Sequence, residues 1–205
     1  MQIYSRWRYL DMPPLNHAVL SASSAYRWLE CPPSALATAD IPDETTIYAQ
    51  EGSAAHEMAE YKIRWHLGAK DLAPPNVGNF NAEEIDRYTD SYAYYATDKI
   101  ETIRKICPDA IVMVEQRLDF SNYVKDGFGT GDLVIVADDV LQVIDFKYGK
   151  GVTVSAELNP QMMLYALGAL NLYGYLYDIK TVKTAIVQPR LDNISEWEIS
   201  VDELL

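Results

Sequence analysis

The spacing of hydrophobic residues changes once along this chain, close to residue 108. Before that point apolar residues return every three to four positions over long stretches, which is typical of amphipathic helices. Proline pairs and stretches without a sustained period separate these helices. The predicted elements are an extension over residues 1–16, a short helix capped by Ser21 or Ser23 and broken at Pro32-Pro33, a loop over residues 40–49, and two long helices over residues 51–67 and 81–107.

After residue 108 β-branched residues dominate, and this composition favours strands. Asp138-Asp139 is typical of a tight hairpin turn, and Asn159-Pro160 opens one further helix. The predicted strands cover residues 110–120, 131–137, 140–148 and 181–188, and the helix precedes the last of them. We therefore expect an α/β fold in which helices flank a mixed four-stranded sheet.

The predicted organisation is a single domain over residues 17–205. Residues 17–107 form its mostly helical N-terminal elaboration, and residues 108–190 hold the sheet and the helix between its strands. Ser200 or Asp202 could cap another helix, but we expect no room for one before residue 205, so a longer natural protein is left open.

Composition narrows the classes of function. Seventeen basic and thirty acidic residues give a net charge of −13, so the surface gains little from general attraction to phosphate. A role with nucleic acid would need a local site, a bound cation or a partner. Cys31 and Cys107 are too few for a disulfide framework, a four-cysteine zinc site or a self-contained iron–sulfur cluster, and we expect Cys31 to be buried.

Targeting signals give a simple expectation. No stretch approaches the roughly 20 apolar residues of a membrane span. The first residues include basic ones but no apolar core of a secretory signal, so we expect a cytoplasmic protein without a membrane partner.

Acidic residues and one lysine interrupt the predicted strands. Alternation within VLQVIDFKY places Asp145 and Lys147 on one face of a strand. Asp132 opens the preceding strand directly after Gly129-Thr130-Gly131, and Glu115 interrupts the apolar run VMVEQRL. These residues are the candidates for chemistry.

Carboxylates on neighbouring strands are suitable ligands for a hard divalent cation such as Mg²⁺. Asp132 and Asp145 could supply two of them, and the main-chain carbonyl of Phe146 a third oxygen. A bound cation would lower the pKa of water and offset charge on a scissile phosphate. Lys147 could then hold the attacking water or help to deprotonate it, provided that Asp145 and Glu115 keep the lysine in place. The ordinary alternative is a surface ion pair worth at most about 1 kcal/mol.

The ordered motifs resemble the RecB-like branch of the PD-(D/E)XK nuclease superfamily, in particular its phage- and prophage-borne members. GTGDLVIVADDVLQVIDFKYGKG matches the metal-binding hairpin, QMMLY matches the Q-x-x-x-Y signature, and His56 in GSAAHEMAE matches a helical histidine. LSASSAYRWLECPPSA near the start adds to the likeness, which spans about residues 17–190. The combination of D…D-x-K with Q-x-x-x-Y is more specific than either half.

The resemblance implies a restriction-endonuclease-like core and a role for each matching residue. His56, Asp132 and Asp145 would be ligands of Mg²⁺ or Mn²⁺, and Lys147 the catalytic lysine. Glu115 would position the lysine, the water or a second metal. Gln161 and Tyr165 would contact the nucleic-acid backbone or orient the acids. Relatives with an iron–sulfur cluster carry three further cysteines after the nuclease core, which this chain lacks, so we expect no such cluster within it.

The leading hypothesis is therefore a Mg²⁺- or Mn²⁺-dependent DNA nuclease in phage replication, recombination or DNA processing. A recombinase, helicase or single-strand-binding protein is an expected partner, and the oligomeric state is open. The alternative is a non-catalytic nucleic-acid or protein-binding module that keeps the fold, which the charge of −13 favours. A metal-dependent nucleotide hydrolase is weaker, because no Gly-rich phosphate loop followed by Lys-Ser/Thr is present.

Each site residue also has an ordinary alternative. His56 could cap a helix or lie partly buried, and Glu115 could be a solubilising charge on an edge strand. Gln161 could be a first-turn helix residue without a partner, and Tyr165 a core residue.

Overall fold

A mixed five-stranded sheet lies at the centre of the computed structural model, which describes residues 18–38 and 46–205. The strands follow the order β1-β2-β3-β4-β5, and β3 and β4 are parallel while the other neighbours are antiparallel. The elements are η1 (Ala22–Ser24), α1 (Ala25–Glu30), α2 (Pro33–Ala37), α3 (Ile47–His66), α4 (Ala82–Ile106), β1 (Ile111–Asp119), β2 (Phe128–Ala137), β3 (Val140–Phe146), α5 (Pro160–Tyr173), β4 (Thr181–Gln188), η2 (Pro189–Leu191), β5 (Asn193–Ser200) and α6 (Val201–Leu204).

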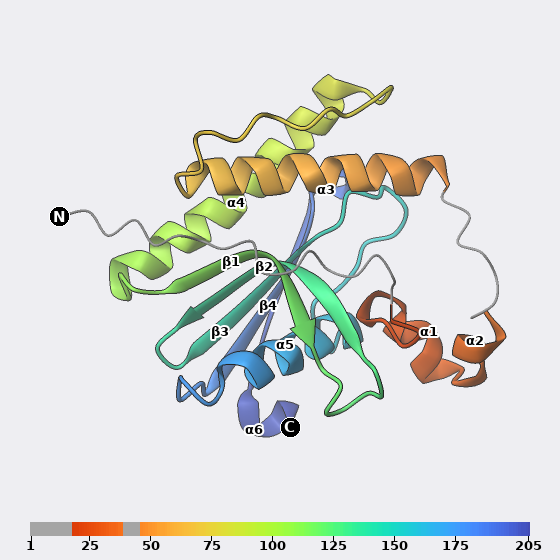
Figure 1. The fold of residues 1–205 in the computed structure, drawn as a ribbon, viewed down its shortest axis with the longest axis vertical. Helices are drawn as coiled ribbons and strands as arrows, with labels where there is room; N and C mark the ends of the chain where they lie inside the picture. The colour runs from red at the N-terminus through yellow and green to blue at the C-terminus, as the bar shows by residue number, and fades with distance from the viewer. Residues whose placement is uncertain (1–17, 39–45) are drawn as a thin grey trace.

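Helices cover both faces of the sheet (Figure 1). One hydrophobic core lies between the sheet and α5 and includes Leu141 and Val143 from β3. A second core lies between the sheet and the long helices α3 and α4, and it includes Ile144 and Phe146 from the same strand. Successive residues of β3 thus serve opposite cores, as the alternation of side chains along a strand requires. The predicted α/β class is confirmed.

The local signals for the hairpin and for α5 act as expected. Ala137 pairs with Val140, so Asp138 and Asp139 form a two-residue turn, and Asp138 takes a left-handed backbone with φ of 50°. The Asn159 side chain accepts hydrogen bonds from the main-chain N–H groups at the start of α5, with Pro160 in the first turn. Because α5 connects the parallel strands β3 and β4, it crosses one face of the sheet.

The sheet has five strands rather than the expected four, because β5 pairs with β4 along its full length. The segment NISEWEIS is polar, and only Trp197 and Ile199 on its inner side pack against a core. This is too weak an alternation to predict a strand, but an edge strand needs only one apolar face.

Three smaller expectations are wrong. α3 begins at Ile47 inside the expected loop, because the Thr46 hydroxyl caps it by accepting from the N–H of Ala49. α6 does form, with a capping box between Ser200 and Glu203. Cys31 is exposed, since it lies just after the end of α1. The expected extension over residues 1–16 lies outside the described residues.

Among the residues that the structure describes, no helix has both the length and the apolar character needed to cross a membrane.

Candidate active site

Three carboxylates lie in one row across the sheet. The β1–β2 ladder pairs Val114 with Leu133 and Gln116 with Gly131, and this register sets Glu115 opposite Asp132 between them. The β2–β3 ladder ends at Leu133–Ile144, and the same register continued by one residue sets Asp132 opposite Asp145. Directly opposed residues on neighbouring antiparallel strands are close neighbours. Glu115, Asp132 and Asp145 therefore come from three adjacent strands at one level.

β1 is distorted at this row. Glu115 has a φ of 54°, a left-handed backbone that costs an ordinary residue roughly 1–2 kcal/mol. Val114 packs in the core on the α3 side, whereas Leu118, four residues later, packs in the core on the α5 side. Regular alternation would place both on one face, so the strand rotates about Glu115. Arg64 of α3 braces the distortion by donating from Nη2 to the carbonyl of Val114 at 2.9 Å.

His56, Glu115 and Asp132 form a compact group of potential metal ligands. One ligand atom from each of them lies within 4.8 Å of the others. His56 enters from the middle of α3, and its Nδ1 is 3.3 Å from Oδ1 of Asp132. The other carboxylate oxygen of Asp132 accepts a 2.6 Å hydrogen bond from the main-chain N–H of Phe146. Asp132 is therefore fixed from two sides, by α3 and by the end of β3.

Asp145 and Lys147 form the second half of the site together with α5. The Lys147 ammonium is 2.9 Å from Oδ2 of Asp145 and donates to Oε1 of Gln161 at 2.9 Å. Gln161 in turn donates from Nε2 to Oδ1 of Asp145 and to the hydroxyl of Tyr165, both at 3.1 Å. Gln161 can make these bonds because the Asn159 cap aims the first turn of α5 at the end of β3. The alternative of an unpartnered Gln161 is wrong.

Burial and neighbouring charges set the protonation of the first group. Burial raises the pKa of Glu115 to about 8, and the charge of Asp132 adds to this effect. Burial lowers the pKa of His56, but the charge and hydrogen bond of Asp132 outweigh it and raise the pKa to about 9. Burial favours a high pKa for Asp132, yet His56 holds the pKa of that carboxyl below its usual value. At neutral pH, Glu115 and His56 each carry a proton.

Lys147 is charged for a similar reason. Its burial lowers the pKa, but Asp145 and then Asp132 outweigh burial and raise the pKa above the ordinary lysine value. Burial also raises the pKa of Asp145, which Lys147 offsets in part. A lysine in this state donates hydrogen bonds, as it does here to Gln161.

The residues present fit a divalent cation. Two carboxylates and an imidazole in one group are a suitable set for Mg²⁺ or Mn²⁺, although the set by itself does not identify the metal. The Tyr92 hydroxyl is a second indication: Tyr92 is 1% exposed and lines the same narrow cleft as Glu115 and Asp132, yet its hydroxyl has no hydrogen-bond partner among the described residues. Buried hydroxyls normally have one, so the polar environment beside Glu115 and Asp132 is incomplete in the metal-free structure.

Comparison with known families identifies the chain. A family model described as a protein of unknown function, DUF2800, matches residues 17–205. The chain belongs to this family. One similar solved structure is a crystal structure of SSO0001, which is 16% identical to this DUF2800 chain. The match covers 86% of this chain and 77% of that chain, with a TM-score of 0.27, which is too low to indicate a shared fold.

The structure of this DUF2800 member thus brings together every site residue that the sequence indicated, but in two groups. His56, Glu115 and Asp132 share the potential metal group, whereas Asp145 contacts Lys147 and the first turn of α5. Metal ligation by Asp145 and by the main-chain carbonyl of Phe146 stays a prediction.

Sequence reasoning missed two residues. Tyr92 falls within the apolar periodicity of the predicted helix over residues 81–107, which indicates only a core residue, and its ring does stack on Phe146 with centroids 4.6 Å apart. Arg64 had one usable signal, since it follows His56 by two helical turns and therefore lies on the same side of α3.

Proposed function

We propose that this chain is a metal-dependent nuclease that hydrolyses phosphodiester bonds in DNA. The observation that carries the proposal is the row of Glu115, Asp132 and Asp145 with the Lys147 ammonium beside it. Carboxylates that hold a dication next to a fixed positive charge suit a reaction in which negative charge builds on phosphate. We further propose that the sheet and its helices are a restriction-endonuclease-like core of the RecB-like PD-(D/E)XK branch, in keeping with the order of the motifs.

Each residue has a defined role in this proposal. His56, Glu115 and Asp132 would hold Mg²⁺ or Mn²⁺, with Asp145 as a further ligand, and the ion would lower the pKa of water and neutralise the scissile phosphate. Lys147 donates to a non-bridging phosphate oxygen and stabilises the charge that develops there. Gln161 holds the ammonium in place, since it accepts from Lys147 while donating to Asp145.

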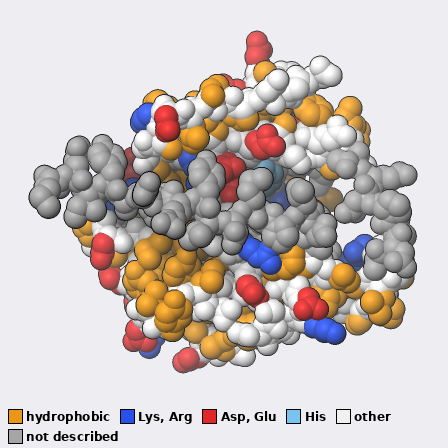
Figure 2. All heavy atoms as spheres, in the orientation of Figure 1, with side chains coloured by type: hydrophobic (Ala, Val, Ile, Leu, Met, Phe, Trp, Pro, Cys, Tyr) orange, Lys and Arg blue, Asp and Glu red, His pale blue; other side chains and the backbone are white. Residues whose placement is uncertain are grey.

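The acidic surface supports a partner for this activity. The net charge is −13, and basic side chains are few and scattered on the face shown in Figure 2. General attraction to DNA is therefore weak, and we propose that a recombinase, helicase or single-strand-binding protein delivers the DNA during phage replication or recombination.

The test is cleavage of end-labelled DNA by purified protein with Mg²⁺ or Mn²⁺. Lys147→Met keeps the length of the side chain but removes its charge, and we expect the rate to fall roughly 100-fold or more. Lys183→Met is the matched control, because Lys183 lies in β4 and pairs with Glu198 away from the row. Equal activity of wild type and Lys147→Met, including equal inertness on every DNA and metal tried, would contradict the proposal.

Calorimetry separates this proposal from a non-catalytic binding module. Wild type should bind Mn²⁺, and Asp132→Asn should not. The reason is that the two carboxylate oxygens of Asp132 connect His56 to the main-chain N–H of Phe146 at the end of β3. Absence of Mn²⁺ binding by wild type would instead favour a nucleic-acid or protein-binding module that keeps only the fold.

A further inference from the structure

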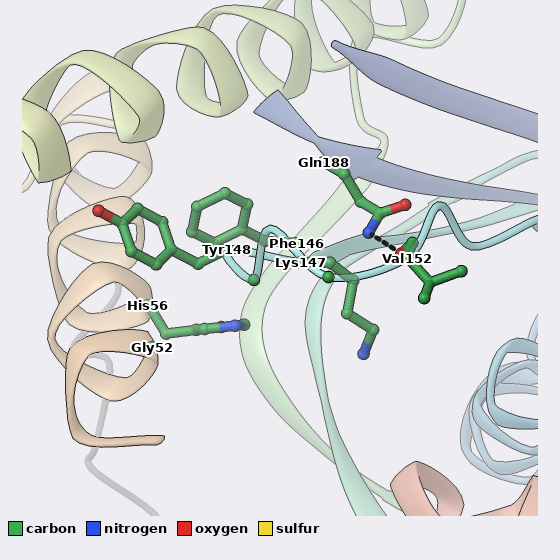
Figure 3. A pocket seen from close by; sticks show the side chains of 9 residues that line it. Gly52, His56, Phe146, Lys147, Tyr148, Val152 and Gln188 are labelled. Carbon is green, nitrogen blue, oxygen red and sulfur yellow. Dashed lines mark hydrogen bonds between the residues drawn. The ribbon is translucent and has the colours of Figure 1, made fainter. Parts of the chain in front are cut away.

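A cavity of about 350 Å³ opens beside the row, between α3 and the chain that follows β3 (Figure 3). His56 and Lys147 reach it from its two sides, so it is continuous with the place where the scissile phosphate would lie. Its volume is near the lower end of the range for small-molecule sites, about 300–1,000 Å³. A site of this size takes one small unit of a polymer rather than a duplex.

Three of the residues that line the cavity are glycines, although neither crowding nor backbone conformation requires a glycine at these positions. A Cβ added to Gly52, Gly149 or Gly151 would meet nothing within 4 Å, and none of the three has a positive φ. Gly52 is the most informative, because it lies within α3, where glycine weakens a helix relative to alanine. It precedes His56 by four residues, so a side chain there would lie on the same face and enter the cavity.

The cavity offers little hydrogen bonding to a base. Among the described residues that line it, Gln188 has its amide engaged: Nε2 donates to the carbonyl of Val152 at 3.1 Å, and Oε1 accepts from the N–H of Val154 at 2.7 Å. Gln188 therefore fixes the loop that follows β3, which contains residues 149–152, and its amide is not free to contact a base. Val152, which is 80% exposed, and the neighbouring Lys150, which is also exposed, lie on this loop. The walls are thus mainly backbone, the rings of Phe146 and Tyr148 and the Val152 side chain, with His56 and Lys147 at the edge next to the row.

We propose that this cavity is the subsite for the nucleotide next to the scissile phosphate, that it accepts an unpaired nucleotide, and that Gly52 keeps it open. The proposal rests on the nuclease function proposed above. The cavity lies between α3 on one side and the 149–152 loop on the other, and its volume of about 350 Å³ suits one nucleotide rather than a base pair.

The test compares Gly52→Leu with Ser53→Leu. Both place a leucine on α3, but Ser53 is exposed and does not line the cavity. The measurements are steady-state cleavage of single-stranded DNA, hydrolysis of bis(p-nitrophenyl) phosphate, which is a small diester without a nucleotide, and calorimetric Mn²⁺ binding. Gly52→Leu should lose roughly tenfold or more in kcat/KM on DNA and keep the other two. Ser53→Leu should match wild type in all three.

Several outcomes would overturn the subsite. One is wild-type kinetics of Gly52→Leu on single-stranded DNA while Lys147→Met is inactive, which leaves the nuclease function standing. Another is equal cleavage of a blunt duplex and a single strand by wild type, which removes the requirement for an unpaired nucleotide. Inertness of wild type towards DNA and towards the small diester overturns both proposals. Gly52→Leu is expected to fold, since leucine favours the helix and its Cβ has open space.

Discussion

At the residue scale, two protons carry the same total charge as one divalent cation, so either can offset the negative charge of the group of His56, Glu115 and Asp132. The raised pKa values, about 9 for His56 and about 8 for Glu115, keep both residues protonated at neutral pH. A cation must displace these protons, because metal ligands bind in their deprotonated forms. The metal-free site is thus a group of carboxylates and an imidazole whose raised pKa values favour protonation of His56 and Glu115.

The prediction at this scale is that Mn²⁺ binding releases protons. Near pH 7 we expect about two protons to leave for each ion bound, from His56 and Glu115, so affinity rises with pH and levels off above pH 9. Calorimetry in buffers with different ionisation enthalpies counts the protons directly. In Glu115→Gln the number released near pH 7 should fall by about one. Release of no protons would contradict the assignment.

His56 and Glu115 also determine how the free energy of unfolding changes with pH. Both pKa values are raised in the folded state, so their contribution to the free energy of unfolding is greatest below the unfolded values. For Glu115 it is lost as pH rises from about 4.5 to 8, and for His56 as pH rises from about 6.5 to 9. Metal-free protein should therefore melt at a lower temperature at pH 9 than at pH 6.5, with a smaller drop when Mn²⁺ is present.

At the element scale, the distance between α5 and the sheet sets the second half of the site. α5 carries Gln161 and Tyr165, and further along it Gly168 meets β1 at Leu118. A Cβ on Gly168 would lie 2.9 Å from the Leu118 Cβ and 3.3 Å from the N of Asp119, where the chain backbone cannot easily move. The close approach of α5 to β1 thus requires glycine here.

Gly168→Ala should therefore lower the free energy of unfolding. Overpacking costs about 1–3 kcal/mol, and the higher helix propensity of alanine offsets about 1 kcal/mol of this loss. Gly52→Ala is the matched contrast, because its Cβ has open space, and it should gain about 0.5–1 kcal/mol. Urea unfolding of both variants measures the difference. A Gly168→Ala variant as stable as wild type would show that α5 does not depend on this contact.

At the scale of the whole molecule, the negative net charge of the protein opposes the binding of an anionic substrate at the local site. The net charge is −13, and the lysines that we place near the substrate are Lys147 in the row and Lys150 on the loop beside it. Binding of DNA therefore depends on the cation and on these few contacts rather than on an extended basic surface.

The salt dependence of cleavage tests this distribution of charge. For about two phosphate contacts on a single strand, the logarithm of affinity should fall with the logarithm of salt with a slope of roughly −1.4. KM for single-stranded DNA, measured over a range of NaCl at fixed Mn²⁺, reports the slope. A much steeper dependence would reveal an extended basic contact that the described surface does not show.

Sequence patterns indicated most of the elements and the polar residues that the structure brings together. The period change near residue 108, the Asp138-Asp139 turn and the Asn159 cap are local signals, and each acts over a few residues. The fifth strand was missed because β5 needs only a thin apolar face once β4 supplies its hydrogen bonds.

Tertiary structure decided how the polar residues meet. Strand register places Glu115, Asp132 and Asp145 in one row, and it depends on the packing of segments that are distant in sequence. The rotation of β1 at Glu115, the unpartnered hydroxyl of Tyr92 and the open space at Gly52 likewise have no local signature. The sequence by itself determined which side chains are present and in what order; only the packing of two helical layers on the sheet determined their distances, and through these distances their protonation.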